Sequence, residues 1–379
     1  MKKISIFGFT GNLGTQALEI LKAHKNQFEF DIFVCDKNLN LAEKVVREFN
    51  PKFIFFSCKE AKKDFKNLKL NVEVLDCLES VVERIEMSPS DIFLSAVSSY
   101  EALDLTISAA KTGKKLLLAN KESLVIFGKY IMDIVSSSGT ELIPIDSEHF
   151  SLYSSLRNLN KNDVKKIFIT ASGGPFLGQN LEQIKNKKAV DALKHPTWKM
   201  GDKITVDSAT LINKCFELIE AKFLFDLDPE KLDILIQPQS IIHSLIELND
   251  GSVEAQLSKP SMIIPLSYGL LEKRSDEVRN KFSLNMFEDE INLQLKFFPE
   301  DRKELLKITM EIMNFGGNRG LIFATLNQIA VNNFLKDKIN FGQIYEFIFN
   351  NYFNFEKKDI NTLEELRSSH KEILEKLNQ

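Results

Sequence analysis

The sequence predicts an α/β protein with an N-terminal parallel sheet covered by helices, a central α+β domain and a C-terminal helical bundle. Three observations support this prediction. Short β-rich runs alternate with helical patterns up to residue 145, strands and loops follow Asp146, and helical periodicity dominates from Asp301 onward. At 379 residues the chain is long enough for more than one core, because a domain commonly holds roughly 150 residues.

The composition excludes several classes of protein. Apolar residues make up 44% and charged residues 27% of the chain, so a sizeable core can form and disorder is excluded. The net charge of −4 argues against nucleic acid or an anionic membrane as the main partner. Four widely spaced cysteines without a C-x-x-C motif exclude a disulfide scaffold and indicate a reduced compartment. Because no window approaches the ~20 apolar residues that span a bilayer, we expect a cytoplasmic enzyme.

The N-terminal part opens with a predicted strand at Lys3–Phe9 and a helix at Thr15–His24, whose apolar residues share one face. Further helices are predicted at Leu41–Phe49 and Glu101–Thr112, and Gly113 is a normal end signal for the latter. The other predicted strands are Asp31–Cys35, Phe53–Phe56, Val72–Leu75, Ile92–Ala96, Lys115–Leu118 and Leu142–Ile145. Strands that alternate with helices form a parallel sheet.

The central part mixes strands with loops. A helix capped by Asp207 or Ser208 is predicted to run to Phe225, and Leu193–Lys203 has the composition of a loop. The predicted strands are Lys165–Thr170, Leu232–Ile236, Ile241–Leu248 and Ser252–Leu257, and Asn249-Asp250-Gly251 joins the last two in a hairpin.

Boundaries follow from these patterns. We expect a parallel-sheet domain at residues 1–145, a central domain at 146–271, a charged linker at 272–300 and a helical domain at 301–379.

The segment Gly8–Gly14 has the pattern G-x-x-G-x-x-G between a predicted strand and a helix. Glycines let the backbone approach a pyrophosphate, and the helix N-terminus supplies N–H groups, so a Rossmann-like domain is predicted, with a plain tight turn as the alternative. Asp36 ends the second strand, where an acidic residue usually binds the 2′-hydroxyl of NAD. Lys37 and Asn38 can hold a 2′-phosphate instead, so both NAD and NADP stay open.

Two carboxylates follow a predicted strand end. Asp146 and Glu148 are two residues apart, and on an extended chain they point the same way and converge on one cation, while Ser147 and His149 face away. Hard oxygen ligands select Mg²⁺ or Mn²⁺. The alternative is a solvated acidic pair, which is the commoner fate of such residues.

The helix that ends at Phe225 can supply a third ligand, because Asn213, Lys214 and Glu217 share one polar face. This face offers a carboxylate for metal beside an amide and an ammonium for phosphate, and the alternative is a surface stripe of paired side chains. Cys215 lies off that face and is interpreted as a packing residue.

Three further motifs each allow a functional and a plain interpretation. Ser172-Gly173-Gly174-Pro175 can cradle a phosphate or form an ordinary turn, which we favour in isolation. The loop His195–Gly201, with the single Trp198, is a lid or a surface loop. Asn120-Lys121-Glu122 faces a ligand crevice or begins a helix with a solvated charge pair. His243 is interpreted as a core histidine.

Taken in order, these motifs resemble those of the 1-deoxy-D-xylulose 5-phosphate reductoisomerase family almost from end to end. The motifs that carry the resemblance are Gly8–Gly14, Leu118–Ser123, Ile145–His149, Ser172–Phe176, His195-Pro196 with Trp198 and Met200-Gly201, Val206–Thr210, Asn213-Lys214 with Glu217 and Ile219–Ala221, and Pro238–Ser240 with Ile242–Ser244. Several separate motifs in the same order are far more specific than any one of them.

The resemblance implies an enzyme of non-mevalonate (MEP pathway) isoprene biosynthesis. It would use NADPH and a divalent metal, Mg²⁺ or Mn²⁺ with Co²⁺ as a further candidate, to rearrange and reduce a sugar phosphate to 2-C-methyl-D-erythritol 4-phosphate. It also implies a homodimer in which the first domain binds NADPH and the central domain is catalytic and carries the dimer contacts. No nucleic acid or membrane partner is expected.

The resemblance also implies a role for each matched residue. The implied metal ligands are Asp146, Glu148 and Glu217; the phosphate-binding residues are Ser172, Ser208, Asn213 and Lys214; and Lys121, Ser147, Glu148 and His195 are further substrate-site residues. The implied NADPH site comprises Thr10, Gly11, Asn12, Leu13, Lys37, Asn38, Asn120, Glu122 and Gly201, and Trp198 and Met200 belong to the closing loop. Asp36 stands where the family usually has glycine, which places a negative charge near the expected 2′-phosphate.

Two other classes of function are alternatives for this sequence. One is a metal-free NAD(P) dehydrogenase of the homoserine or semialdehyde type, in which the three acidic residues would be surface charges. The other is a non-catalytic dinucleotide sensor that binds a partner through the C-terminal helices.

Overall fold

The computed structural model describes residues 1–98, 100–198, 200–272, 284 and 292–377. The chain forms two compact units. The first holds Met1–Ser123, Ile131–Phe150 and Ser261–Phe282, and the second holds Leu124–Tyr130, Ser151–Pro260 and Ser283–Gln379. Much of the predicted linker at 272–300 lies outside the described residues, and the four-part division of the chain stays a prediction.

The first unit contains the predicted parallel sheet, which has seven strands among its described residues, in the order β4-β3-β2-β1-β5-β6-β7. The strands are β1 (Lys2–Phe7), β2 (Phe28–Cys35), β3 (Phe53–Phe56), β4 (Glu73–Val74), β5 (Ile92–Ser95), β6 (Lys115–Leu118) and β7 (Glu141–Pro144). The strand order reverses between β1 and β5. At such a switch point, ligands bind beyond the carboxyl ends of the strands.

The helices of this unit follow the predicted alternation. They are α1 (Asn12–Ala23), α2 (Leu39–Phe49), α3 (Lys59–Lys66), α4 (Leu78–Met87), α5 (Leu103–Lys111) and α12 (Ile263–Leu271). Helices α6 (Lys121–Ser138) and α7 (Ser147–Leu156) have residues in both units. Strands β5 and β6 are buried at every residue and consist mostly of apolar residues, as expected for strands covered by helices on both faces of a parallel sheet.

Two glycines of the Gly8–Gly14 segment are required by close packing. Gly8 has φ +89°, and a Cβ there would lie 2.5 Å from the carbonyl oxygen of Ala96. A Cβ on Gly14 would lie 2.3 Å from the carbonyl oxygen of Gly8. These glycines therefore bring the end of β1, the start of α1 and the end of β5 together.

The second unit is built on a mixed sheet with the order β11-β10-β8-β9-β12 among the residues described. Strands β8 (Val164–Ala171) and β9 (Leu232–Ile236) are parallel, whereas β10 (Ile242–Leu248), β11 (Val253–Leu257) and β12 (Lys296–Phe297) pair antiparallel with their neighbours. The predicted hairpin joins β10 to β11, and Gly251 adopts φ +87° in its turn. The short edge strand β12 was not predicted.

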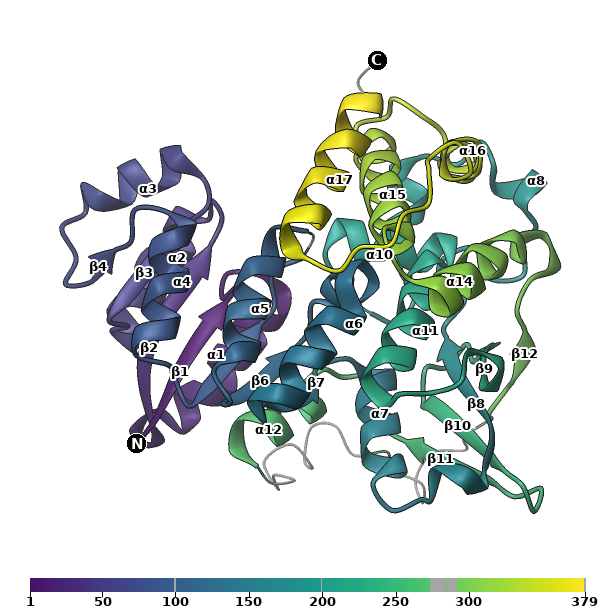
Figure 1. The fold of residues 1–379 in the computed structure, drawn as a ribbon, viewed down its shortest axis with the longest axis horizontal. Coiled ribbons are helices and arrows are strands. Elements are labelled where there is room, and N and C mark those ends of the chain that lie inside the picture. Colours follow the sequence, from purple (N-terminus) through teal and green to yellow (C-terminus); the bar gives the residue numbers. More distant parts are fainter. Residues whose placement is uncertain (99, 199, 273–283, 285–291, 378–379) are drawn as a thin grey trace. The chain divides into compact units, whose positions relative to one another are not determined.

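Helices form the rest of this unit (Figure 1). They are α8 (Leu181–Ile184), α9 (Ala189–Ala192), α10 (Asp202–Thr210), α11 (Ile212–Phe225), α14 (Glu304–Phe315), α15 (Arg319–Leu335), α16 (Phe341–Tyr352) and α17 (Leu363–Leu377). The predicted C-terminal helical region is confirmed by the last four. Among the described residues, no helix combines the length and apolar character that crossing a membrane requires.

The predicted helix from Asp207 or Ser208 to Phe225 is wrong in its start. Leu211 has φ +66°, a left-handed conformation that ends α10 and precedes α11. Asp207 and Ser208 therefore lie inside α10 rather than at a helix cap. A leucine adopts this conformation only when its surroundings enforce it, and the Leu211 side chain is buried.

Helix α11 is the central helix of the second unit. It packs against β8 and β9 and against α14, and every residue from Ile212 to Ala221 is buried. Phe216 contacts Phe323 of α15 edge-to-face, with ring centroids 5.3 Å apart. A helix buried on all sides is normally apolar throughout, so its polar side chains are exceptions that call for a functional explanation.

Candidate active site

The loop after β1 presents the start of α1 at the carboxyl edge of the parallel sheet. Gly11 is the residue before the first turn of α1 and has no side chain to cap it. The N-terminus of a helix without a side-chain cap favours an anion, through its N–H groups and its dipole. The predicted cofactor residues Thr10, Gly11, Asn12 and Leu13 all lie in this loop and first turn.

Asn120 connects the ends of two neighbouring strands. Its Oδ1 accepts a hydrogen bond of 2.8 Å from the backbone N–H of Ser123 and caps α6, while its Nδ2 donates to the carbonyl of Val97 at 2.6 Å. The Nδ2 also lies 3.3 Å from Glu122 Oε2. Asn120 and Glu122 are therefore placed at the edge where the sequence predicts the cofactor.

Asp36 follows β2, and Ser57 holds its side chain. The Ser57 hydroxyl donates to Asp36 Oδ1 at 2.8 Å. Asn38 Oδ1 accepts from the backbone N–H of Leu41 at 3.2 Å and so caps α2. Asp36, Lys37 and Asn38 are all exposed, so an acidic and a basic side chain are both available at the end of this strand.

Asp146 begins a helix, so the predicted extended geometry of Asp146 to Glu148 is wrong. Asp146 Oδ1 accepts from the backbone N–H groups of Glu148 at 3.0 Å and His149 at 3.2 Å. These bonds favour a helical first turn directly after β7. Ser147 does not face away, because its hydroxyl donates to Glu148 Oε2 at 2.7 Å. His149 is buried with its Nδ1 3.1 Å from Asp146 Oδ1.

Lys121 provides a positive charge beside these carboxylates. Its Nζ lies 2.9 Å from Asp146 Oδ2, and the Lys121 and Asp146 side chains are 8% and 14% exposed. A partly buried ammonium this close stabilises the ionised carboxylate. The interpretation of Lys121 as a solvated helix-terminal charge is therefore wrong.

The polar face of α11 is also buried rather than a surface stripe. Asn213 and Lys214 are each 8% exposed, and Glu217 is 1% exposed. Lys214 Nζ lies 2.6 Å from Glu217 Oε2, and Asn213 Nδ2 donates to Glu217 Oε1. Buried charges are retained when they are paired or when they bind a ligand. Cys215, by contrast, packs in the core, and burial raises the pKa of its thiol to about 12.

The three acidic side chains meet the geometric requirement for a shared cation. One carboxylate oxygen from each of Asp146, Glu148 and Glu217 lies within 4.8 Å of the other two. Three carboxylates form a hard, anionic donor set that suits Mg²⁺ or Mn²⁺. Their hydrogen bonds to backbone N–H groups, Lys121, Asn213 and Lys214 orient the oxygens, as outer partners of metal ligands commonly do.

Two serines and a histidine from separate segments form a second polar group. His195 Nε2 lies 3.2 Å from Ser172 Oγ and 3.1 Å from Ser208 Oγ. His195 Nδ1 accepts from the backbone N–H groups of Thr197 at 3.2 Å and Trp198 at 3.0 Å. The neutral ring therefore carries its proton on Nε2, directed at the serines.

The environment of His195 keeps this ring neutral. Burial and, secondarily, the positive charge of Lys214 lower the pKa of His195 to about 4. Two hydroxyls, an imidazole N–H and the nearby lysine charge together suit a phosphate group.

The turn Ser172–Pro175 packs closely on α10. A Cβ on Gly174, which has φ +65°, would lie 3.0 Å from both the Ala209 Cα and the Ser208 carbonyl oxygen. The backbone N–H of Gly174 donates to Ser172 Oγ at 3.2 Å. With His195 and Ser208 beside it, the phosphate-binding interpretation of this turn is favoured over the ordinary turn.

The loop predicted at Leu193–Lys203 follows α9, which ends at Ala192, and runs into α10, which begins at Asp202. Trp198 and Met200 are half-buried, and Gly201 is exposed and precedes the first turn of α10. Lys199 lies outside the described residues. His243, interpreted as a core residue, is buried on β10.

Two residues near the polar group of Ser172, His195 and Ser208 were not predicted from the sequence. Asp207 and Asn327 are buried and hydrogen-bonded to each other at 2.8 Å. No local spacing signal connects them, because they are 120 residues apart.

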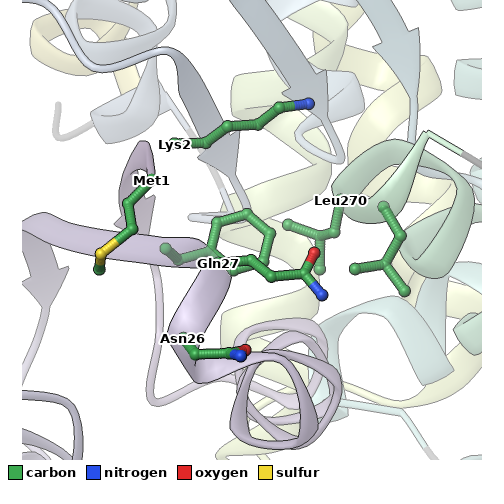
Figure 2. A pocket seen from close by; sticks show the side chains of 7 residues that line it. Met1, Lys2, Asn26, Gln27 and Leu270 are labelled. Atoms are coloured by element: carbon green, nitrogen blue, oxygen red, sulfur yellow. The ribbon is translucent and has the colours of Figure 1, made fainter.

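A hollow of about 370 Å³ in the first unit is a separate feature (Figure 2). It is lined by Met1, Lys2, Asn26, Gln27, Phe28, Leu270 and Leu271. None of these is a predicted site residue, and Lys2 is paired with Glu272 at 2.6 Å. The candidate active site therefore lies elsewhere.

The glycine loop at the switch point of a parallel sheet defines a class, the oxidoreductases that bind a dinucleotide beyond the strand ends. Three family models match the chain. Residues 4–128 match 1-deoxy-D-xylulose 5-phosphate reductoisomerase, and residues 142–225 and 257–375 match C-terminal domains of the same enzyme. The chain belongs to the 1-deoxy-D-xylulose 5-phosphate reductoisomerase family.

Full-length relatives agree with this assignment. The chain is 38% identical to the 1-deoxy-D-xylulose 5-phosphate reductoisomerase of Thermoanaerobacter pseudethanolicus, over 100% of this chain and 98% of the relative. It is 37% identical to that of Thermodesulfovibrio yellowstonii over 92% and 91% of the two chains.

Solved structures also match over nearly the whole chain. One is the Zymomonas mobilis reductoisomerase in complex with NADPH, at a TM-score of 0.85 and 30% identity over 98% of this chain and 97% of the other. Another is a DOX-P reductoisomerase in complex with NADPH, fosmidomycin and magnesium, at a TM-score of 0.87 and 29% identity over 98% and 96%.

Proposed function

We propose that this chain catalyses the metal-dependent rearrangement and NADPH-dependent reduction of 1-deoxy-D-xylulose 5-phosphate to 2-C-methyl-D-erythritol 4-phosphate, a step in non-mevalonate isoprenoid precursor biosynthesis. Family membership over the full length supports the reaction. The single observation that carries the assignment of the site is the approach of three carboxylate oxygens to within 4.8 Å of one another. That cluster disfavours both the metal-free dehydrogenase and the non-catalytic sensor.

Asp146, Glu148 and Glu217 hold the divalent cation in this proposal. The bound cation supplies Lewis-acid stabilisation of the negative charge that develops on the substrate oxygens. Asp146 is oriented by two backbone N–H groups and by Lys121. Glu217 is oriented by Asn213 and Lys214. These partners orient the carboxylate oxygens before substrate arrives.

The substrate phosphate is held by side chains of the second unit. Ser172, Ser208, Asn213 and Lys214 bind it, and His195 donates a hydrogen bond from Nε2. His195 is neutral at physiological pH and carries its ring proton on Nε2. It therefore donates this hydrogen bond without first being protonated. Phosphate binding remote from the reacting carbons orients the substrate for both steps.

Further residues contact substrate and cofactor. Lys121 and Ser147 contact the substrate, and Trp198 and Met200 close over it to exclude water. The residues that line the NADPH site are Thr10, Gly11, Asn12, Leu13, Lys37, Asn38, Asn120, Glu122 and Gly201. This assignment is supported by the glycine loop, Asn38 and Asn120, which lie at the carboxyl edge of the parallel sheet.

The proposal includes a homodimer located in the cytoplasm that binds no nucleic acid. Leu293, Leu295 and Phe297 are 40%, 49% and 88% exposed and lie on alternate residues that lead into the edge strand β12. Among the described residues β12 is an edge strand of its sheet, and an apolar strip at a sheet edge suits association with a second chain. All four cysteines are free thiols, which suits a reducing compartment.

The decisive experiment follows the absorbance of NADPH with 1-deoxy-D-xylulose 5-phosphate present, with and without Mg²⁺. We expect oxidation of NADPH only when substrate and Mg²⁺ are both present, and loss of activity after EDTA that Mg²⁺ restores. Activity that survives thorough EDTA treatment would overturn the metal-dependent mechanism and favour a metal-free dehydrogenase.

A further inference from the structure

Asp207 is a buried carboxylate directly before the predicted phosphate-binding Ser208. Its side chain is 3% exposed, and each of its two oxygens has a partner. Oδ2 lies 2.7 Å from Lys203 Nζ, one turn earlier in α10. Oδ1 accepts a hydrogen bond of 2.8 Å from Nδ2 of Asn327 in α15. A carboxylate taken out of water requires such partners, so Asp207 is fixed in place by them.

Asn327 is a fully buried amide within an apolar stretch of α15. Its neighbours Leu326 and Ala330 are likewise buried. Among the residues that the structure describes, the Oδ1 of Asn327 has no hydrogen-bond partner. Burying an amide for a single hydrogen bond is unfavourable compared with an apolar residue. The bond to Asp207 is therefore the polar contact that explains an asparagine at this position.

A second buried hydrogen bond ties the same end of α10 to the C-terminal helices. The Tyr345 hydroxyl of α16 donates to the carbonyl of Thr210 at 3.0 Å. Thr210 is the last residue of α10, before the left-handed Leu211. Asn327 and Tyr345 thus hold the last turn of α10 from two different helices, and α10 packs against α15.

Ser208 lies between these two anchor points in the sequence, and its side chain contacts a different segment. Its side chain is half-buried, and its Oγ lies 3.1 Å from His195 Nε2. Successive side chains on a helix point about 100° apart, so the rotation of α10 about its axis sets the direction of the Ser208 hydroxyl. The bond from Asn327 to Asp207 acts directly on that rotation.

We infer that Asn327 is a positioning residue for substrate phosphate, which acts through Asp207 to fix the rotation of α10 and the placement of the Ser208 hydroxyl. This inference rests on the proposed function, because it assumes that Ser208 binds the phosphate. It gives the C-terminal helices a part in substrate binding, although they contribute none of the predicted ligands.

The test compares Asn327→Ala with Asn318→Ala in the full-length enzyme. Asn318 is a matched control, because it is a buried asparagine next to the same helix, donates to the carbonyl of Glu356 at 2.9 Å and accepts from the N–H of Lys358 at 2.9 Å. Both variants should lower the melting temperature. Asn327→Ala should raise the KM for 1-deoxy-D-xylulose 5-phosphate by about tenfold with a smaller change in kcat, whereas Asn318→Ala should leave this KM within about twofold.

A double-mutant cycle with Ser208→Ala separates positioning from general destabilisation. If Asn327 acts through Ser208, adding Asn327→Ala to Ser208→Ala should raise the KM no further. Equal KM values for the Asn327→Ala and Asn318→Ala enzymes, or fully additive effects in the cycle, would overturn the inference. Should Asn327→Ala fail to fold, the same-sized Asn327→Asp, which cannot donate when ionised, replaces it. A wild-type enzyme without NADPH oxidation would instead contradict the proposed function.

Discussion

Lys214 and Glu217 form an ion pair inside α11, with Lys214 Nζ 2.6 Å from Glu217 Oε2 and the Glu217 side chain 1% exposed. The pair lies three residues apart, as many surface pairs do. What distinguishes it is burial, because a carboxylate removed from water needs cations or hydrogen-bond donors in place of water. Lys214 and Asn213 are two such partners, and in the proposed mechanism a divalent metal is the third.

Glu217→Gln tests this arrangement. The amide keeps the size of the side chain but removes the anionic ligand, so we expect metal-dependent turnover to fall by at least about a hundredfold. NADPH affinity, measured by fluorescence titration, should stay within about twofold. The control is Glu304→Gln, because Glu304 and Lys307 form an exposed pair with the same spacing and the same 2.6 Å separation. Turnover equal to wild type in Glu217→Gln would contradict the assignment of the ligand.

The pH dependence of stability tests the neutral state of His195. Its pKa is lowered from 6.5 to about 4, so between these values the unfolded chain binds a proton that the folded protein does not. The contribution of His195 to the free energy of unfolding is therefore fully present above pH 6.5 and is lost as the pH falls toward 4. Urea unfolding at pH 7 and pH 5 should show a smaller loss of stability in His195→Gln than in wild type. An identical loss in both proteins would show that His195 titrates normally.

Elements that depend on local pattern could be predicted from the sequence. The strand that becomes β1 and the glycine loop after it are adjacent in the chain, so periodicity and composition were sufficient. The hairpin at Asn249–Gly251 was predictable for the same reason, since its turn residues tolerate positive φ.

Features that depend on tertiary packing could not be predicted. Leucine is a poor candidate for positive φ, yet the buried Leu211 breaks the predicted helix. Asp146 after a strand is compatible with an extended chain or with a helix cap, and only its two N–H bonds distinguish them. Local spacing likewise gives no sign that Glu217 is buried or that Asn327 contacts Asp207.

Asp36→Gly tests the acidic residue at the end of β2. We expect the variant to bind NADPH about three- to tenfold more tightly, because it removes a negative charge beside the expected 2′-phosphate. NADH should lose affinity, since the carboxylate that can accept from a 2′-hydroxyl is gone. Kd values for both cofactors, measured by fluorescence at one ionic strength, check this. Ser57→Ala, which removes the hydrogen bond to Asp36 Oδ1, shows whether the orientation of the carboxylate matters. Unchanged affinities in Asp36→Gly would mean that the side chain points away from the cofactor.

Gly174→Ala tests whether the turn after β8 must lie against α10 for substrate to bind. An added Cβ would lie 3.0 Å from the Ser208 carbonyl oxygen and the Ala209 Cα, so the turn and α10 must separate by a few tenths of an ångström. We expect the KM for 1-deoxy-D-xylulose 5-phosphate to rise by about tenfold, because Ser172 and Ser208 then no longer converge on one phosphate.

Gly178→Ala is the matched control for this change. Gly178 lies in the same loop with φ +80°, but a Cβ there has no atom within 4 Å among the described residues. Both alanine variants therefore carry the strain of positive φ, about 1 kcal/mol each, and both should lower the melting temperature, Gly174→Ala by more because its Cβ also presses on α10. Only Gly174→Ala disturbs the contact with α10, so only that variant should raise the KM. Equal KM values in the two variants would separate the turn from phosphate binding and leave Gly174 with a purely structural role.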